Sequence, residues 1–236
     1  MNAPIAAKRF YTAARARAVD GGFGVALDAR ALKTPSGAAF IVPTQALAEA
    51  CAVEWAAQGE HIIPASMPLT QLAFAAIDHP APRRDEVIAH IAKYAETDLC
   101  CHRAHSPVGL AARQAEVWDP LVAAGAERYG VRLPIVAGIV PAAMDAASMA
   151  QARAIASALD AFQLTALSQG ASLAGSILIA LALLDGRLDG AGAFAAATID
   201  EAWSMAHWGE DHEMRARLDR LRGEFDAVAR FMVALR

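Results

Sequence analysis

The residue types best suited to chemistry gather near the C-terminus, between Asp200 and Glu213. This segment, the acidic stretch, reads DEAWSMAHWGEDHE and holds five carboxylates, two histidines and two tryptophans. Histidine and carboxylate side chains are the usual protein ligands of catalytic zinc, which activates a water molecule for hydrolysis. A set formed by His207, Asp211 and His212 would make the chain a metal-dependent hydrolase, and this is the alternative function that the sequence leaves open.

A continuous helix does not bring the two histidines of the acidic stretch together. His207 and His212 are five residues apart, which places them about 140° apart around a helix of roughly 3.6 residues per turn. They would share a face only if Gly209 bent the chain sharply. The spacing therefore favours another use of the same residues, as a surface that docks a partner through an exposed tryptophan set among charges.

The elements around the acidic stretch decide which of its side chains reach the surface. A helix over residues 191–208 predicts that Trp203 lies in the core. The apolar face of that helix would hold Ile199, Ala202, Trp203 and Ala206. The expected partner-binding residues are those left at the surface: Glu201, Trp208, Gly209, Glu210, Asp211 and Glu213. Acidic residues at the start of the next helix also gain ~0.3–1 kcal/mol each from the helix dipole, so a purely solvated role for them stays open.

Three other groups of residues resemble chemical motifs only in part. Cys100-Cys101-His102 lacks the second ligand pair that structural zinc takes from another segment, and adjacent cysteines point in different directions. The segment from Gly170 to Gly175 has one residue too many for the GxSxG turn of a serine hydrolase. The glycines near residue 22 precede a strand, whereas a phosphate-binding loop must open into a helix. We therefore expect neither a metal nor a cofactor.

Composition and charge exclude several classes of protein. The chain has 236 residues, of which 56% are hydrophobic and 19% charged, which is too apolar for a disordered chain. Its net charge of -4 argues against a nucleic-acid-binding surface. The longest apolar run, Leu173–Leu184, is interrupted by Gly175 and Ser176 and is shorter than the ~20 residues of a membrane span, so it predicts a buried helix and no membrane insertion. The start of the chain has no apolar signal-peptide segment, and the three cysteines form no CxxC pair, which indicates a reducing compartment.

The N-terminal part of the chain has the pattern of a small β-rich domain. Residues 1–8 are expected to form a flexible tail. Residues 9–42 then read as strands, with alternating residues after the turn signal Asp20-Gly21-Gly22. We expect this domain to extend over residues 9–66.

One helix completes the β-rich domain. It begins at Thr44, a residue type that caps helices well, and carries Leu47, Cys51 and Trp55 on one face. The spacing predicts that Trp55 is a core anchor and that Cys51 is buried beside it. Pro64 and Pro68 disfavour helix before them, so we expect residues 61–67 to be extended, and we place the domain boundary between residues 66 and 67.

From residue 67 to residue 236 the pattern is helical. It predicts a larger all-α domain, an orthogonal helix bundle, and hence an α+β chain. One long helix is expected to begin at Ser106-Pro107, to contain Trp118 and to break or kink at Asp119-Pro120. Further helices are expected over residues 148–162, 164–184 with a bend at Gly170, 191–208 and 211–236. The last of them repeats apolar residues at spacings of four and three from Met214 to Leu235, which is typical of a packed seam.

Eight short motifs, in order along the chain, resemble one known family. They are RFY at 9–11, LDARALKTPSG at 27–37, VPT at 42–44, AVEWAAQ at 52–58, IIPASMPLT at 62–70, YAETDLC at 94–100, QAEVWDP at 114–120, and DEAW at 200–203 with WGED at 208–211. Together they resemble the assembly chaperones of F-type ATP synthase that act on the alpha subunit of the catalytic head, known as the ATP synthase assembly factor 2 family. The resemblance covers the chain from Arg9 onward, although Ala29 stands where the family often has glycine and Ser204 where it often has glutamine.

The resemblance implies a non-enzymatic assembly factor that needs no cofactor. Such a protein binds the free alpha subunit of ATP synthase and prevents its aggregation until the beta subunit replaces it. Because the match begins at residue 9, it leaves no room for the presequence of mitochondrial members, so we expect a bacterial protein of the cytoplasm. We expect a monomer, with dimerisation through the 214–235 seam as the other possibility. The motif residues assigned to structure are Trp55, Met67, Pro68, Leu69, Trp118 and Trp203.

Overall fold

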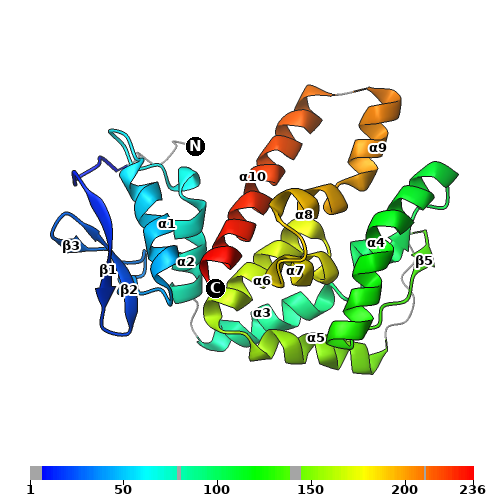
Figure 1. The fold of residues 1–236 in the computed structure, drawn as a ribbon, viewed down its shortest axis with the longest axis horizontal. Helices are drawn as coiled ribbons and strands as arrows, with labels where there is room; N and C mark the ends of the chain where they lie inside the picture. The colour runs from blue at the N-terminus through cyan, green and yellow to red at the C-terminus, as the bar shows by residue number, and fades with distance from the viewer. Residues whose placement is uncertain (1–6, 79–80, 139–144, 210) are drawn as a thin grey trace. The chain divides into compact units, whose positions relative to one another are not determined.

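A computed structural model describes residues 7–78, 81–138, 145–209 and 211–236 (Figure 1). Contacts group the chain into two compact units, one formed by residues up to 80 together with Arg230–Arg236, the other by Ala81–Ala229. The first unit combines a small sheet with helices and the second is mainly helical, which confirms the α+β class. The boundary between residues 66 and 67 stays a prediction, and residues 1–6 of the predicted tail lie outside the described residues.

The first unit begins with a three-stranded antiparallel sheet. Strands β1 (Ala14–Val19) and β2 (Gly22–Leu27) pair over their full length around the predicted turn at Asp20-Gly21. Strand β3 (Arg30–Ala31) pairs with the end of β2. The hairpin therefore forms where the glycine-rich turn signal placed it.

The turn between β2 and β3 depends on Asp28. This residue has a φ of 50°, in the left-handed region that side chains rarely adopt. Its carboxylate accepts hydrogen bonds from the backbone N–H groups of Ala13 at 2.9 Å and Thr12 at 3.0 Å, which hold the turn in place. The same hydrogen bonds lower the pKa of Asp28.

Three helical elements follow the sheet in the first unit: α1 (Gln45–Ala56), the 3-10 turn η1 (Pro64–Ser66) and α2 (Pro68–Asp78). Helix α1 packs against β1 and β2 (Figure 1). The Thr44 hydroxyl accepts the N–H of Leu47 at 3.2 Å, which confirms the predicted N-cap. The face that carries Leu47, Cys51 and Trp55 is buried, as its spacing predicted.

Polar motif residues of α1 position the start of α2. The Glu54 carboxylate accepts the backbone N–H groups of Leu69 and Thr70, both at 2.8 Å, and so caps this helix with a negative charge. Gln58 accepts a backbone N–H from the extended segment before the helix and donates to a serine hydroxyl in η1. Met67 and Leu69 are buried at the same place. The motifs at residues 52–58 and 62–70 are thus explained by one network of hydrogen bonds between them.

The second unit is a series of helices with two very short strands. Its elements are α3 (Ala81–Lys93), η2 (Leu99–Cys101), β4 (His102–Arg103), α4 (Val108–Tyr129), β5 (Val136–Ala137), α5 (Ala146–Ala158), α6 (Ala161–Ala174), α7 (Ile177–Leu184), α8 (Gly190–Ala197), α9 (Ile199–Trp208) and most of α10 (His212–Ala234), whose residues from Arg230 onward belong to the first unit. Strands β4 and β5 pair in parallel. The sequence patterns did not predict this short pairing, which forms because the backbone after η2 finds hydrogen-bond partners in the link after α4.

Helix α7 forms the most buried part of the second unit. Every residue from Ile177 to Leu183 is buried, which confirms that the apolar run Leu173–Leu184 contains a core helix. Within the described ranges no helix is long and apolar enough to cross a membrane. In α10 the buried positions of the predicted seam are Leu218, Phe225, Val228 and Met232.

Some helices end at other places than predicted. Helix α4 continues through Pro120, because the buried side chains of Trp118 and Leu121 hold the turns on both sides of it. The bend predicted at Gly170 occurs instead at Gly175, which ends α6 with a φ of 61°. Gly170 stays inside α6 and lets α7 pack closely against it.

Two further helix boundaries escaped the sequence patterns. Thr198 divides α8 from α9 with φ -123° and ψ 28°, and its hydroxyl donates to the Phe194 carbonyl at 2.7 Å. The prediction of a single helix over residues 191–208 was therefore wrong. The helix predicted over 148–162 ends at Ala158, because Asp160 caps α6.

Candidate functional site

The acidic stretch occupies helix α9 and its junction with α10. Figure 1 shows the two helices connected at one end of the second unit. Gly209 ends α9 with a φ of 88°, a conformation that favours glycine. Asp211 accepts the N–H of Glu213 at 3.2 Å and thereby caps the first turn of α10. The described residues on the two sides of the junction, Trp208, Gly209 and Asp211, are exposed.

Of the predicted partner-binding residues, Trp208, Gly209, Asp211 and Glu213 lie at this junction, whereas Glu201 lies in the first turn of α9. Trp208 is 78% exposed, and Asp211 and Glu213 are exposed as well. Glu201 is less available, because its carboxylate accepts a hydrogen bond from Arg217 of α10 at 2.9 Å. The indole, rather than any charge, is therefore the largest group that the junction offers to a partner.

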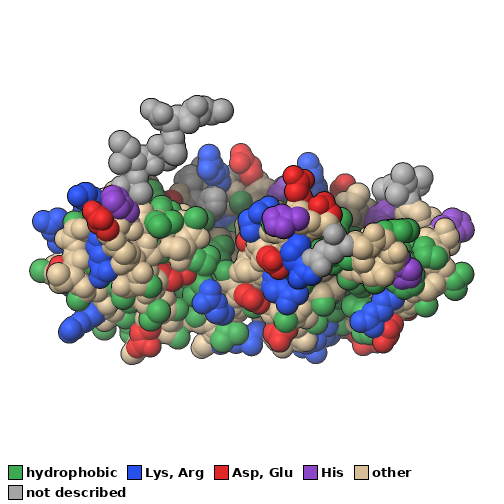
Figure 2. Space-filling view, turned by 90° about the horizontal axis from the view of Figure 1, so that it is seen from above, with side chains coloured by type: hydrophobic (Ala, Val, Ile, Leu, Met, Phe, Trp, Pro, Cys, Tyr) green, Lys and Arg blue, Asp and Glu red, His purple; other side chains and the backbone are tan. Residues whose placement is uncertain are grey.

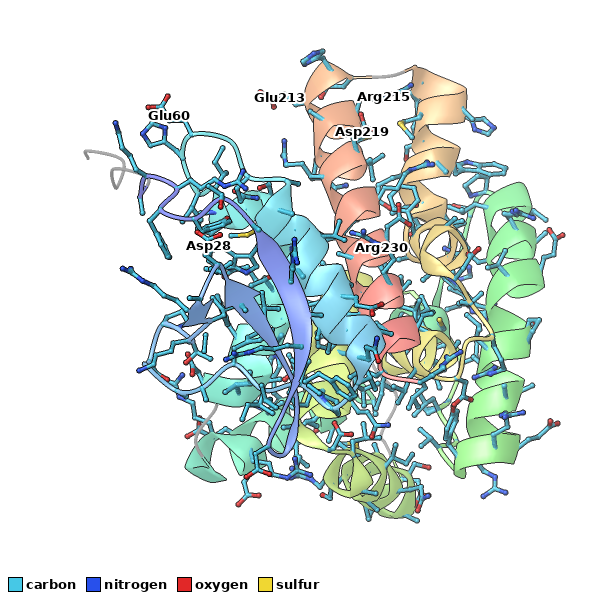
Figure 3. The ribbon with its side chains drawn as sticks, turned by 60° about the vertical axis from the view of Figure 1, so that its left-hand side comes forward. Asp28, Glu60, Glu213, Arg215, Asp219 and Arg230 are labelled. Atoms are coloured by element: carbon cyan, nitrogen blue, oxygen red, sulfur yellow. The ribbon has the colours of Figure 1, made fainter. Side chains whose placement is uncertain are left out.

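Charges of both signs surround the junction. Figure 3 labels Glu213, Arg215 and Asp219 on the first turns of α10. In the view of Figure 2, acidic and basic side chains are mixed rather than separated into one-sign fields. Glu210, the remaining charged residue predicted here, lies outside the described residues.

Trp203 does not lie in the core, contrary to prediction. It is half-buried, with its indole against α4 at Gly109, where a Cβ would come within 2.6 Å of the ring. The ring stacks on His207, with centroids 4.2 Å apart. Because Thr198 divides the expected long helix, α9 buries only Ile199 of its predicted apolar face.

The apolar face of α9 opens instead into a groove that it shares with α8. This α8–α9 groove has a volume of about 630 Å³, within the range of roughly 300–1,000 Å³ that is common for ligand pockets. Its lining residues are Arg113, Ala191, Phe194, Ala195, Thr198, Ile199, Ala202, Trp203, Ala206, His207 and Arg222. The groove therefore combines apolar walls with two arginines and a histidine.

The structure gives no support to the metal-dependent hydrolase. His207 uses its Nδ1 to donate to the Trp203 carbonyl at 2.9 Å, so one of its two nitrogens is already engaged. His212 belongs to the next helix. Among the residues that the structure describes, no three His, Cys, Asp or Glu side chains are grouped so that they could hold a metal ion.

The cysteine cluster is part of the core of the second unit. Cys100 and Cys101 are buried, and burial raises the pKa of the Cys101 thiol to about 12, which opposes the thiolate that a metal needs. Beside them, the buried Asp98 accepts hydrogen bonds from the Ser176 hydroxyl at 2.7 Å and from the Cys100 N–H at 2.9 Å. These residues connect η2 to the start of α7, which is a structural function.

Motif residues of α4 hold α8 and α9 in position. The indole N–H of the buried Trp118 donates to the Ala196 carbonyl, near the end of α8, at 2.8 Å. Gln114 donates to the carboxylate of Asp200, in the first turn of α9, at 2.7 Å. Asp200 therefore belongs to the scaffold of the site, although it opens the acidic stretch.

Sequence reasoning missed three residues that shape this site: Arg103, Gly109 and Arg222. Arg103 forms an ion pair with Asp119 at 2.8 Å and lies over the ring of Trp118, 5.4 Å from its centroid. A glycine inside a helical pattern was the available signal for Gly109. Neither arginine carries a local signal, because each one meets its partner only in the folded chain.

Comparison with known proteins gives consistent matches. Residues 8–126 match the family described as ATP12 chaperone protein. The mitochondrial protein atp12 of Schizosaccharomyces pombe is 26% identical over 216 residues, which are 86% of this chain and 74% of that protein. The crystal structure of Atp12 from Paracoccus denitrificans is 38% identical, with a TM-score of 0.91 over 98% of this chain and 99% of that one. A chaperone candidate from Agrobacterium tumefaciens is 34% identical, with a TM-score of 0.89 over 97% and 86%.

Proposed function

Because the chain belongs to the ATP12 chaperone family, we propose that it is an assembly factor that binds the free alpha subunit of ATP synthase. In this function it keeps the alpha subunit from aggregating until the beta subunit takes its place. An unassembled subunit exposes apolar surface that a neighbour normally covers, and such patches promote aggregation. A chaperone needs only to cover that surface reversibly, without a chemical step. We place this activity in the bacterial cytoplasm.

The observation that best supports a docking function is the exposed indole of Trp208. With 78% of the residue exposed, a partner that covers it gains hydrophobic free energy. The carboxylates of Asp211 and Glu213 beside it favour a basic or amphipathic partner surface and steer its approach. The proposed docking surface consists of Glu201, Trp208, Gly209, Glu210, Asp211 and Glu213.

Co-purification tests the proposed function. Tagged chain is co-expressed with the alpha subunit in a host that lacks its own chaperone of this family and the beta subunit. We expect soluble alpha subunit to co-purify with the chain, and added beta subunit to release it. An alpha subunit that stays insoluble and does not co-purify would reject the function.

Charge reversal tests the docking surface separately. Glu201→Lys and Glu210→Lys should each weaken capture of the alpha subunit, because they repel a basic surface that the native carboxylates attract. Both variants should fold, since the exposed ion pair of Glu201 with Arg217 contributes at most ~1 kcal/mol. Glu127→Lys, an exposed position on α4, is the matched control. Unchanged capture by both junction variants would reject the assignment.

A further inference from the structure

We propose that the α8–α9 groove is a second contact in the same complex and that it binds an apolar segment of the alpha subunit that carries a carboxylate. This inference rests on the proposed function, since it concerns the partner assigned there. It supplies what the junction around Trp208 lacks, a concave site for apolar side chains of the partner.

The shape of the groove suits an inserted apolar segment. Its open sides carry exposed alanines, Ala191 and Ala195 on α8 and Ala202 and Ala206 on α9. In each pair the residues are four apart, so two consecutive turns of each helix present only a methyl group on this side. Small side chains on both helices leave the volume of about 630 Å³ open to the partner.

Aromatic rings form the deeper walls and are already held in place. Phe194 is buried and contacts Phe225 edge-on, with ring centroids 6.4 Å apart. Trp203 is fixed between Gly109 on one side and His207 on the other. Because these rings need little ordering on binding, complex formation costs this chain less conformational entropy than it would at a mobile surface.

The charges of the groove specify an acidic rather than a basic occupant. None of its described lining residues is acidic. Arg222 is exposed, with its guanidinium over the Phe194 ring, 4.6 Å from the centroid, and no described carboxylate forms an ion pair with it. Arg113 pairs with Glu116 at 2.6 Å, but both side chains are more than half exposed, so a partner carboxylate can compete for it. An apolar segment with a carboxylate satisfies both the walls and the arginines.

The groove and the junction therefore differ in charge although α9 contributes to both. The junction offers an indole beside carboxylates, and the groove offers apolar walls beside arginines. Two subsites of opposite charge allow one orientation of the partner and disfavour the reverse, because like charges would then meet.

Site-specific photo-crosslinking identifies the occupant. A photoreactive phenylalanine analogue replaces Ala206 in the full chain, which is irradiated in complex with the alpha subunit, and cross-linked peptides are identified by mass spectrometry. We expect a peptide of the alpha subunit with an apolar run and an Asp or Glu within about four residues of it, the reach of one helical turn. A peptide without a carboxylate, or one from a second copy of this chain, would overturn the proposal. The analogue at Ala154, exposed on α5, is the control and should give no cross-link to the alpha subunit.

Affinity measurements separate this inference from the proposed function. Ala206→Glu and Arg222→Glu should each weaken binding of the alpha subunit at least tenfold, whereas Ala154→Glu should bind as wild type. Thermal melts check folding, and Arg222→Glu serves alone if Ala206→Glu does not fold. If the wild-type chain does not bind the alpha subunit, the proposed function fails. If the wild type binds and both groove variants bind equally well, only the groove assignment is wrong.

Discussion

Truncation of Trp208 to alanine should remove much of the affinity for the alpha subunit and leave the fold intact. The indole lies at the end of α9 and is 78% exposed, so the free protein loses little packing in Trp208→Ala. Surface substitutions of this kind change the free energy of unfolding by about 0.5 kcal/mol or less. The effect should therefore appear in binding and not in stability.

The expected loss follows from the exposed surface of the side chain. Tryptophan presents roughly 150–250 Å², so the 78% that Trp208 exposes corresponds to roughly 120–190 Å² that a partner could cover. At ~25 cal/mol per Å² this burial is worth ~3–5 kcal/mol. Since alanine keeps part of the contact, we expect a loss of ~2–4 kcal/mol, the range of an interface hot spot. The Kd should rise roughly 30- to 1,000-fold.

Titration calorimetry or biolayer interferometry with purified alpha subunit measures the Kd, and a thermal melt measures stability. Ile135→Ala is the matched control, because Ile135 is another exposed apolar residue of the second unit, at 51%. A Kd for Trp208→Ala within threefold of wild type, or an equal loss for Ile135→Ala, would refute the hot-spot reasoning. A lowered melting temperature would show that Trp208 supports the fold instead.

Further predictions concern stability and can be checked by urea unfolding. Trp118→Phe leaves a buried carbonyl of α8 without its donor and should lower the free energy of unfolding by ~1–3 kcal/mol; an unchanged value would contradict the importance of this hydrogen bond. Burial raises the pKa of Asp98 from 3.8 to about 6, so the folded chain binds this proton more tightly than the unfolded chain. The stability that results is fully present below pH 3.8 and is lost as the pH rises through 6. Relative to Asp98→Asn, the wild type should therefore lose roughly 2–3 kcal/mol between pH 4 and pH 7, and parallel curves would refute this. Gly190→Ala places a Cβ 2.8 Å from the Asp226 Cα and should destabilise the chain by ~1–3 kcal/mol. Its matched control, Gly223→Ala in α10, meets nothing within 4 Å and should stabilise it by ~0.5–1 kcal/mol; equal effects would contradict the packing argument.

Local signals predicted most of the elements. The i, i+4, i+8 spacing of Leu47, Cys51 and Trp55 was sufficient for the buried face of α1, since helical periodicity repeats within a few residues. The hairpin at Asp20-Gly21 and the cap at Thr44 followed from residue types that suit one backbone conformation. Helix boundaries such as Thr198 were missed, because the packing of neighbouring helices decides where these alanine-rich segments change direction. Helix propensity does not mark the position, since alanine favours helix on both sides of it.

For the site, the sequence by itself determined which residues gather at one place and the family that their order resembles. It placed Trp208, Gly209 and Asp211 at a junction between helices, and the structure has that junction. Only the tertiary structure decided that Trp203 is half-buried beside an open groove and that Glu201 is engaged by Arg217. The physical reason is distance along the chain: Glu201 meets a partner 16 residues away, and Gln114 meets Asp200 across 86. Periodicity reports neighbours within a few turns, whereas the groove exists only where four separate helices, α4, α8, α9 and α10, come together in the folded chain.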